Sequence, residues 1–314
     1  MIELPSFTLA NLLQYLATGI INGSLYALVA IGFALIINVT GRFHIAFSVT
    51  FAASAFVAGQ VGISFGLPFA VAALIGMAAG AILGVLIERI VYWPLNRRIG
   101  MAALLVIFVA SLGVSTVGEA TLSLGWLNTP GVAIQGFNLK GIRVGGVSFT
   151  NLNLVTVIAA VIVIIGLHIV IKRTALGRMI RAVRGNPEMS AAVGIDPKRI
   201  YLIVFAIGSA VGGLAAVFSA TSALATPDMG TTPILYAITV AFVAGTFASP
   251  LAIGVTGLVI GVIESLSTFI VSSIWTQTFV FGALLLYVAA RPIAEHLRTV
   301  MERRRYRESL AVRS

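Results

Sequence analysis

Cysteine is absent from this 314-residue chain, and charged residues make up only 10% of it. Without a thiol, the chain can form neither a disulfide nor a thiolate metal site. A soluble domain of this length would carry about 25% charged residues. Hydrophobic residues instead account for 59% of the chain, and the mean hydropathy is +1.07. This composition excludes a soluble domain and indicates a membrane protein that crosses the bilayer several times.

Signatures of catalysis are also missing. The three histidines are dispersed, and no pair has the HExxH spacing of a zinc protease. No lysine follows a glycine, so the chain has no GxxxxGK[ST] loop for nucleotide phosphates. We therefore expect a chain that is not an enzyme, binds no metal or cofactor and hydrolyses no ATP itself.

Positive charge is concentrated in three places. The net charge is +10, and 17 of the 20 lysines and arginines lie in 89–98, in 172–199 and in the tail from Arg291. Basic loops between apolar spans face the cytoplasm. Membrane orientation explains this excess, so binding to nucleic acid is not expected.

The apolar runs have the length of membrane-spanning helices, which need about 20 residues. Outer-membrane strands would instead show segments of about ten alternating residues. We predict an all-α fold, a polytopic transmembrane helical bundle with about eight to ten spans, forming a single domain over 1–314. Asn22, Gly23 and Ser24 offer a break that would divide the first run into two pieces. The candidate spans are 9–40, 45–63, 67–88, 101–124, 151–171, 200–223, 233–248, 250–272 and 274–290.

Counting spans gives a consistent orientation. The basic loops 89–98 and 172–199 fall inside, whereas 125–150 and 225–232 fall outside. The basic tail 291–314 is then cytoplasmic. The N-terminus lacks the basic start of a cleaved signal, so the first run is expected to be retained. The uncharged turn before Pro250 is either a full loop or a re-entrant break.

The longest polar stretch, 172–199, contains signals for two short helices. Thr174 is placed to cap the first helix. Asn186 suits the N-cap of the second, followed by Pro187 at its first position and Glu188 in its first turn. Gly194 suits the position just after its end. This stretch is therefore expected to be folded.

A helix as short as the second one is unstable alone in water and must pack against something. Two alternatives are its own bundle and a cleft in a cytoplasmic partner. Small or flexible residues, including Ala191 and Ala192, permit close approach to a partner. We expect partner contact and coupling to involve Gly177, Arg178, Arg181, Pro187, Glu188, Ala191, Ala192 and Gly194.

Other polar or small residues within the spans have structural explanations. Glycines recur every fourth residue in three runs, which indicates close helix packing. Ionisable residues within spans are candidates for function. Glu264 is expected to pair with a nearby Ser or Thr hydroxyl, Glu119 to reach water, and Glu88 with Arg89 to lie at the inner membrane surface. His44 is more consistent with a structural role than with catalysis.

Several stretches, taken in order, resemble the inner-membrane permease of high-affinity branched-chain amino acid ABC importers, the Liv-type permeases. They are GSLYAL at 23–28, ERIVYWPLNR at 88–97, TALGR at 174–178 and the glycine-rich region from Gly245 to Glu264. The resemblance covers nearly the whole chain. The family usually has an Asn-aromatic-Ala-His-Gly run where this chain has HIAFS at 44–48. Branched-chain amino acids are therefore the family default rather than a finding.

The resemblance implies a permease in a bacterial inner, or plasma, membrane. Its partners would be a second homologous permease subunit, as a hetero- or homodimer, two cytoplasmic ATPase subunits that use ATP and Mg, and a periplasmic substrate-binding protein, with membrane lipid around the bundle. Polar groups and broken helices suit a substrate path, although ordinary helix packing explains the same residues. The candidate path residues are Ser24, Tyr26, His44, Phe47, Thr246 and Ser249.

Three alternatives to amino acid import stay open. A permease for another small solute, such as urea, an amide or a sugar, would have the same architecture. An ion-coupled secondary transporter needs carboxylates near the membrane midplane, and only Glu264 and Glu119 are available. An intramembrane enzyme needs a paired acid and base or a metal cluster, which the sequence does not provide.

Overall fold

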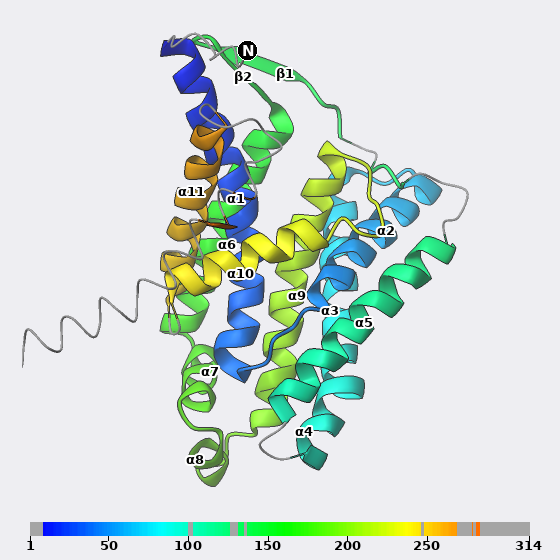
Figure 1. Ribbon diagram of the computed structural model, residues 1–314, viewed down its shortest axis with the longest axis vertical. Helices are drawn as coiled ribbons and strands as arrows, with labels where there is room; N and C mark the ends of the chain where they lie inside the picture. The colour runs from blue at the N-terminus through cyan, green and yellow to red at the C-terminus, as the bar shows by residue number, and fades with distance from the viewer. Residues whose placement is uncertain are drawn as a thin grey trace, which may run out of the picture.

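The computed structural model describes residues 9–99, 103–125, 131–134, 137–245, 248–268, 278 and 281–282. Its architecture is a helical bundle (Figure 1), which confirms the predicted all-α class. Seven helical stretches in the described part are long and apolar enough to cross a membrane. These stretches are α1 (Leu9–Thr40), α2 (Phe47–Phe65), α3 (Phe69–Ile87) with the helical residues that follow it, α5 (Ala103–Gly125), α6 (Asn151–Arg173), α9 (Pro197–Ser222) and α11 (Pro250–Ser267).

Short elements mark the two ends of the bundle. One end carries α4 (Trp93–Ile99), α7 (Ala175–Gly185) and α8 (Pro187–Ala192), and we call it the basic end. The other carries strands β1 (Gly141–Val144) and β2 (Val147–Thr150), and we call it the hairpin end (Figure 1). The two basic loops predicted to share a side therefore do lie at the same end.

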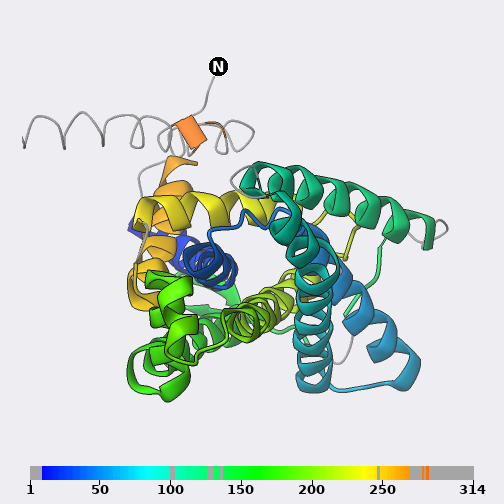
Figure 2. The ribbon, with the colours of Figure 1, turned by 90° about the horizontal axis from the view of Figure 1, so that it is seen from below.

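Helix α1 lies at the centre of the bundle. Residues 27–36 of α1 are buried on all sides, as expected for a helix that is apolar around its whole circumference. Seen from the basic end in Figure 2, α6, α7 and α11 lie to one side of α1 and α9, and α3 and α5 lie to the other. The predicted break at Asn22–Ser24 does not occur, because α1 is a single helix. Gly23 serves close packing instead, since a Cβ there would lie 2.8 Å from Leu258 Cα in α11.

Glycines bring neighbouring backbones into contact at several crossings. A Cβ on Gly80 of α3 would lie 2.3 Å from the Ser209 carbonyl oxygen in α9, and one on Gly213 would lie 2.2 Å from the Gly76 carbonyl oxygen. The same relation joins Gly261 of α11 to α1. The glycine runs are therefore packing surfaces, as predicted.

Helix α10 (Thr231–Ala244) is shorter than the span predicted at 233–248. Its 14 residues extend about 21 Å, which is less than the hydrocarbon thickness. It ends at Gly245 with φ of +92°, and Ser249 then caps α11 by accepting a hydrogen bond from the Ala252 amide. The predicted span 274–290 and the tail 291–314 lie outside the described residues, apart from residues 278 and 281–282.

Two local structures were not predicted. The loop 125–150 contains an antiparallel hairpin with Val144 opposite Val147. Gly145 and Gly146 between them have φ of +57° and +85°, as a type I′ turn requires. The apolar run after α3 continues as a π-helical turn, η1 (Glu88–Tyr92), before α4. A π-turn in an otherwise regular helix often marks a functional position.

The glycine contacts predict a large difference between two Gly→Ala changes. Gly80→Ala places a methyl group against backbone and should cost about 1–3 kcal/mol through overpacking. Gly166→Ala in α6 meets open space and should be neutral or stabilising by up to about 1 kcal/mol. Thermal unfolding of both variants in one detergent tests this, and equal midpoints would contradict the packing role.

Candidate functional site

The helix signals of 172–199 are realised in the structure. The Thr174 hydroxyl accepts from the Gly177 amide at 3.1 Å and donates to the Val170 carbonyl at 2.6 Å. The Asn186 side chain accepts from the Met189 amide at 2.9 Å, with Pro187 in the first turn of α8. Gly194 has φ of +87°, as expected after a helix end. Both predicted caps are confirmed.

Helix α7 is fixed firmly to α6. Ile180 and Val183 on its apolar face are buried. Gly177 lies so close to α6 that a Cβ would be 2.2 Å from the Ile171 carbonyl oxygen. The Arg181 guanidinium donates to that same carbonyl, which places a cation at the negative end of α6. Helix α7 is therefore attached directly to a membrane-spanning helix.

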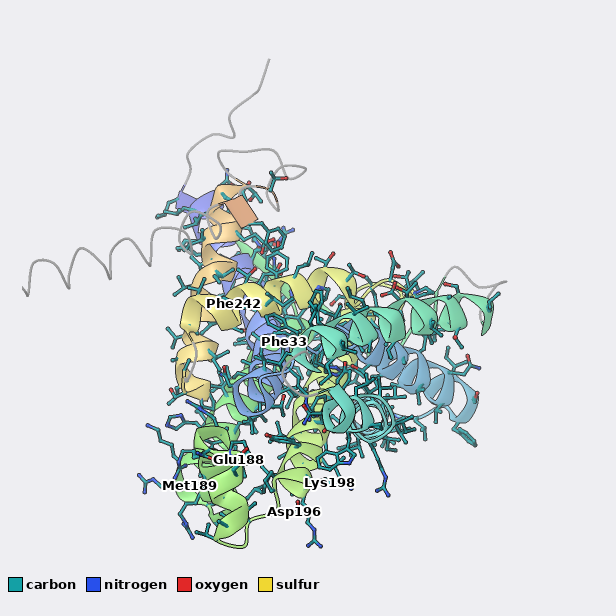
Figure 3. All side chains as sticks on the ribbon, turned by 60° about the horizontal axis from the view of Figure 1, so that its bottom comes forward. Phe33, Glu188, Met189, Asp196, Lys198 and Phe242 are labelled. Atoms are coloured by element: carbon teal, nitrogen blue, oxygen red, sulfur yellow. The ribbon has the colours of Figure 1, made fainter. Side chains whose placement is uncertain are left out.

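Helix α8 is exposed, in contrast to α7. Ser190 is its only buried residue, and Met189 and Val193 are 70% and 75% exposed. Figure 3 shows Glu188 and Met189 on the outside of the basic end, away from the packed interior marked by Phe33. The bundle thus leaves this short helix uncovered. The remaining candidate coupling residues of α8 and its ends, Pro187, Ala191, Ala192 and Gly194, are also exposed, as is Arg178 in α7.

The start of α9 joins the two basic stretches. The Asp196 carboxylate accepts from the Lys198 amide at 3.0 Å and so caps α9. The Lys198 ammonium lies 4.7 Å from the centre of the Trp93 ring in α4. Surface contacts of this kind are individually weak. Together they place α4 beside the connection that follows α8.

The candidate path residues do not converge on one site. Ser24 is buried and donates to the Ile20 carbonyl of its own helix. His44 and Phe47 lie in the core, and Ser249 caps α11 near the basic end. Tyr26 stacks on Tyr236 of α10. Thr246, the sixth candidate, lies outside the described residues. The packing explanation therefore fits Ser24, His44 and Phe47 as well as a path does.

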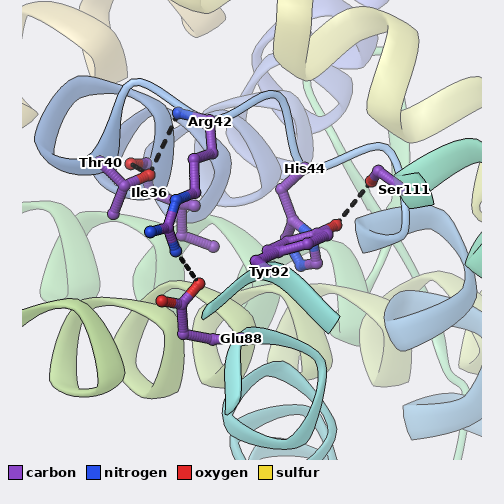
Figure 4. Close-up of polar contacts among 7 residues, drawn as sticks. All are labelled: Ile36, Thr40, Arg42, His44, Glu88, Tyr92 and Ser111. Atoms are coloured by element: carbon purple, nitrogen blue, oxygen red, sulfur yellow. Dashed lines mark hydrogen bonds and ion pairs between the residues drawn. The ribbon is translucent and has the colours of Figure 1, made fainter. Parts of the chain in front are cut away.

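A buried ion pair holds the connection between α1 and α2. The Arg42 guanidinium donates to the Glu88 carboxylate (Figure 4), and the two residues are 2% and 1% exposed. Arg42 also lies over the Tyr201 ring of α9, 5.1 Å from its centre. Glu88 is therefore enclosed by the protein itself, and its position relative to the membrane surface stays a prediction. A carboxylate buried in the protein needs a cation, and the α1–α2 connection supplies one.

A chain of hydrogen bonds extends from Tyr92, which lies in the same π-helical turn, η1, as Glu88. His44 Nδ1 lies 2.9 Å from the Tyr92 hydroxyl, which lies 2.6 Å from the Ser111 hydroxyl in α5 (Figure 4). Ser111 accepts from the Ala46 amide at 2.8 Å. His44 also packs edge-on against Phe205. This network supports a structural role for His44. In the sequence, Tyr92, one turn after Glu88, was the residue that could have indicated such a network.

A second polar cluster lies further along α5 and includes Glu119. Ser115 donates to Glu119 at 3.1 Å, and the hydroxyls of Ser48 and Ser115 are 2.6 Å apart. Glu119 therefore has hydroxyl partners within the protein. Among the described residues, no group of three or more His, Cys, Asp and Glu side chains is placed to hold a metal ion.

Among the described residues, α1 helps to line at least three cavities. Two lie at the basic end, with volumes of about 380 and 460 Å³, and share Asn38, Val39 and Arg184 in their walls. Ser249 and Arg181 line the cavity of about 380 Å³. Partial burial lowers the pKa of the Arg184 guanidinium below its usual value. The third cavity, about 340 Å³, is a groove at the hairpin end between α1 and α11.

These features define a polytopic helical membrane protein with a rigidly supported, exposed helix at its basic end. The chain belongs to the family described as branched-chain amino acid transport system / permease component, which matches residues 15–289.

Similar proteins cover nearly the same length. The chain is 26% identical to the high-affinity branched-chain amino acid transport system permease protein BraD of Pseudomonas aeruginosa, over 89% of this chain and 94% of that protein. It is 25% identical to the corresponding LivH protein of Escherichia coli K12, with the same coverage. It is also 29% identical to the D-allose transport system permease protein AlsC of E. coli K12, over 68% of this chain and 64% of that protein. No solved structure matches.

Disruption of the Arg42–Glu88 pair should be costly. Glu88→Gln leaves the guanidinium buried without its countercharge, and we expect a loss of about 3–5 kcal/mol of unfolding free energy. Asp196→Asn, which breaks the exposed pair with Arg199, should cost less than about 1 kcal/mol. Thermal unfolding of both variants and of the double variant Arg42→Met, Glu88→Leu measures the difference. Similar losses at the two pairs would show that the buried pair has no special role.

Proposed function

We propose that this chain is the transmembrane permease subunit of a bacterial ABC importer that moves a small polar solute into the cytoplasm, with branched-chain amino acids as the first candidate. Family membership and the names of BraD and LivH support this substrate class. The names of AlsC and of the fructose import permease FruF of Bifidobacterium longum keep a sugar as the second candidate. ATP and Mg would act in partner subunits.

One observation carries the proposal: α8 is exposed while its support is rigid. A six-residue helix has little stability in isolation, so its caps and its attachment to α7 hold it in place. Its exposed Met189 and Val193 offer apolar contact area to a partner. An ATPase that grips α8 would move α7, and Arg181 and Gly177 would pass that movement to α6.

The orientation follows from the charge distribution. The basic end would face the cytoplasm, where two ATPase subunits bind, and the C-terminal tail would lie on the same side. The hairpin end would then receive solute from a periplasmic binding protein. A second permease subunit, identical or homologous, would complete the transport path in the bacterial inner membrane.

Alternating access fits the distribution of space in the bundle. Cavities occur at the basic end and at the hairpin end. Between them, residues 27–36 of α1 are buried with Phe33 and Phe47 in edge-on contact. This closed middle supports a resting state in which no continuous path joins the cavities at the two ends of the bundle. ATP-driven movement of α7 would open it.

A charge on the exposed face of α8 should prevent partner binding. Val193→Asp is expected to abolish co-purification of the ATPase subunits, because it places a carboxylate in an apolar contact. Val144→Asp in β1, where the valine is 62% exposed, is the matched control and should leave co-purification unchanged. Retention of the ATPases by Val193→Asp would count against α8 as the docking helix.

A bulky side chain on α8 should uncouple ATP hydrolysis from solute transport. Ala191→Arg should leave the protein folded, because Ala191 is exposed. It should reduce solute uptake per ATP hydrolysed severalfold, because the long charged side chain holds the ATPase away from α8. The two rates are measured together in proteoliposomes with all subunits. Uptake and hydrolysis in the wild-type ratio would refute coupling through α8.

A further inference from the structure

The groove at the hairpin end has walls of neutral polar side chains. They come from one face of α1, with Asn11, Thr18 and Asn22 at helical spacing, and from Thr268 just after α11. Such a polar surface is unusual in helices that are otherwise strongly apolar. Glu264 is the only charged residue among the described residues that line the groove. The groove therefore leads from the hairpin end to one carboxylate.

This carboxylate is only half satisfied. One Glu264 oxygen accepts from the Tyr236 hydroxyl, whereas the other, Oε2, is buried without a hydrogen-bond partner among the described residues. Neither of the ion pairs described above, Arg42–Glu88 and Arg199–Asp196, involves Glu264. A carboxylate oxygen enclosed without a countercharge is costly in a membrane protein. It suits a visiting cation.

Two aromatic rings lie at the same point. Tyr26 of α1 stacks on Tyr236 of α10, with ring centres 4.1 Å apart and planes within 4°. Tyr26 also lies beside the Glu264 carboxylate. Aromatic faces attract organic cations, and more strongly when water is excluded. Asn22, which lines the groove, lies one helical turn before Tyr26 on α1.

We propose that Glu264, with Tyr26 and Tyr236, recognises the ammonium group of the transported solute at the end of this groove. This inference rests on the proposed transport function and selects among its candidate substrates. An ammonium group offers three donors and a positive charge, which suits the unpaired Oε2 and the adjacent rings. A sugar supplies no such charge. A solute with a carboxylate and no amine would be repelled by Glu264.

The absence of cysteine makes a direct test possible. Asn22→Cys introduces the only thiol into the full-length chain, inside the groove. The rate of maleimide labelling in lipid nanodiscs is measured with leucinamide, which has an amine and no carboxylate, and with 4-methylpentanoate, which has the reverse. We expect leucinamide to slow labelling at least severalfold and 4-methylpentanoate to leave it unchanged. Equal effects of the two probes would overturn the proposal.

Variants then assign the effect to the carboxylate. In the Asn22→Cys chain, Glu264→Gln should raise the leucinamide concentration needed for protection by at least about tenfold, as expected for loss of a charged hydrogen-bond acceptor. Glu119→Gln, at the other hydroxyl-bonded carboxylate, should leave it unchanged. Protection that survives in Glu264→Gln would refute the assignment. Where Glu264→Gln does not fold, Tyr236→Leu is used instead, and protection by leucinamide that stays unchanged in that variant refutes the proposal.

Transport assays distinguish a failure of the proposed ammonium site from a failure of the proposed import function. In proteoliposomes with all subunits, ATP-dependent uptake of leucine by the wild type and its loss in Glu264→Gln support both. Uptake that is equal in the two chains, or wild-type uptake of D-allose and not of leucine, refutes the ammonium site and leaves the importer intact. Uptake that does not depend on ATPase subunits refutes the proposed function, and the labelling result still decides the ammonium site.

Discussion

Direct contact between helix backbones is the constraint on which this bundle depends. In a bilayer, helices gain nothing from leaving water, so association rests on the closeness of packing. Gly80 against Ser209, and Gly23 against Leu258, bring α3 onto α9 and α1 onto α11 with no side chain between them. These contacts fix α1 at the centre. The cavities at both ends and the position of α7 follow from that placement, because each is formed against α1 or against helices that touch it.

The basic end combines a rigid support with an unsatisfied surface. Thr174 and Asn186 fix the ends of α7 and α8 through side-chain caps, and Gly177 allows α7 to touch the backbone of α6. Beyond them, α8 is exposed apart from Ser190. A firmly attached helix with exposed apolar side chains at Met189 and just after its end is suited to receive force from a partner. This property supports the proposal that another subunit supplies the ATP-driven movement.

Sequence reasoning predicted the features that depend on local rules. The caps around α8 and the glycine packing surfaces could be predicted, because capping and small-residue spacing depend on residues only a few positions apart in the sequence. The pairing of Arg42 with Glu88 was not, since it joins positions 46 residues apart that meet only after α1, α2 and α3 have packed. The continuity of α1 through Gly23 was missed for the same reason: a glycine that suggests a break in one helix can instead be required by a second helix. Gly145 and Gly146 are a turn signal in the sequence, but the hairpin that they join was not predicted.

Two carboxylates within the spans now have contrasting environments. Glu88 has a guanidinium beside it and is sealed from solvent, so its charge is already compensated and it serves to hold the α1–α2 connection in place. Among the described residues, the Glu264 carboxylate accepts from the Tyr236 hydroxyl, and it lines a polar groove on α1. A residue needed only for packing would gain stability from a permanent cation, as Glu88 does. The environment described for Glu264 instead suits a partner that arrives and leaves, which is the behaviour of a transported solute.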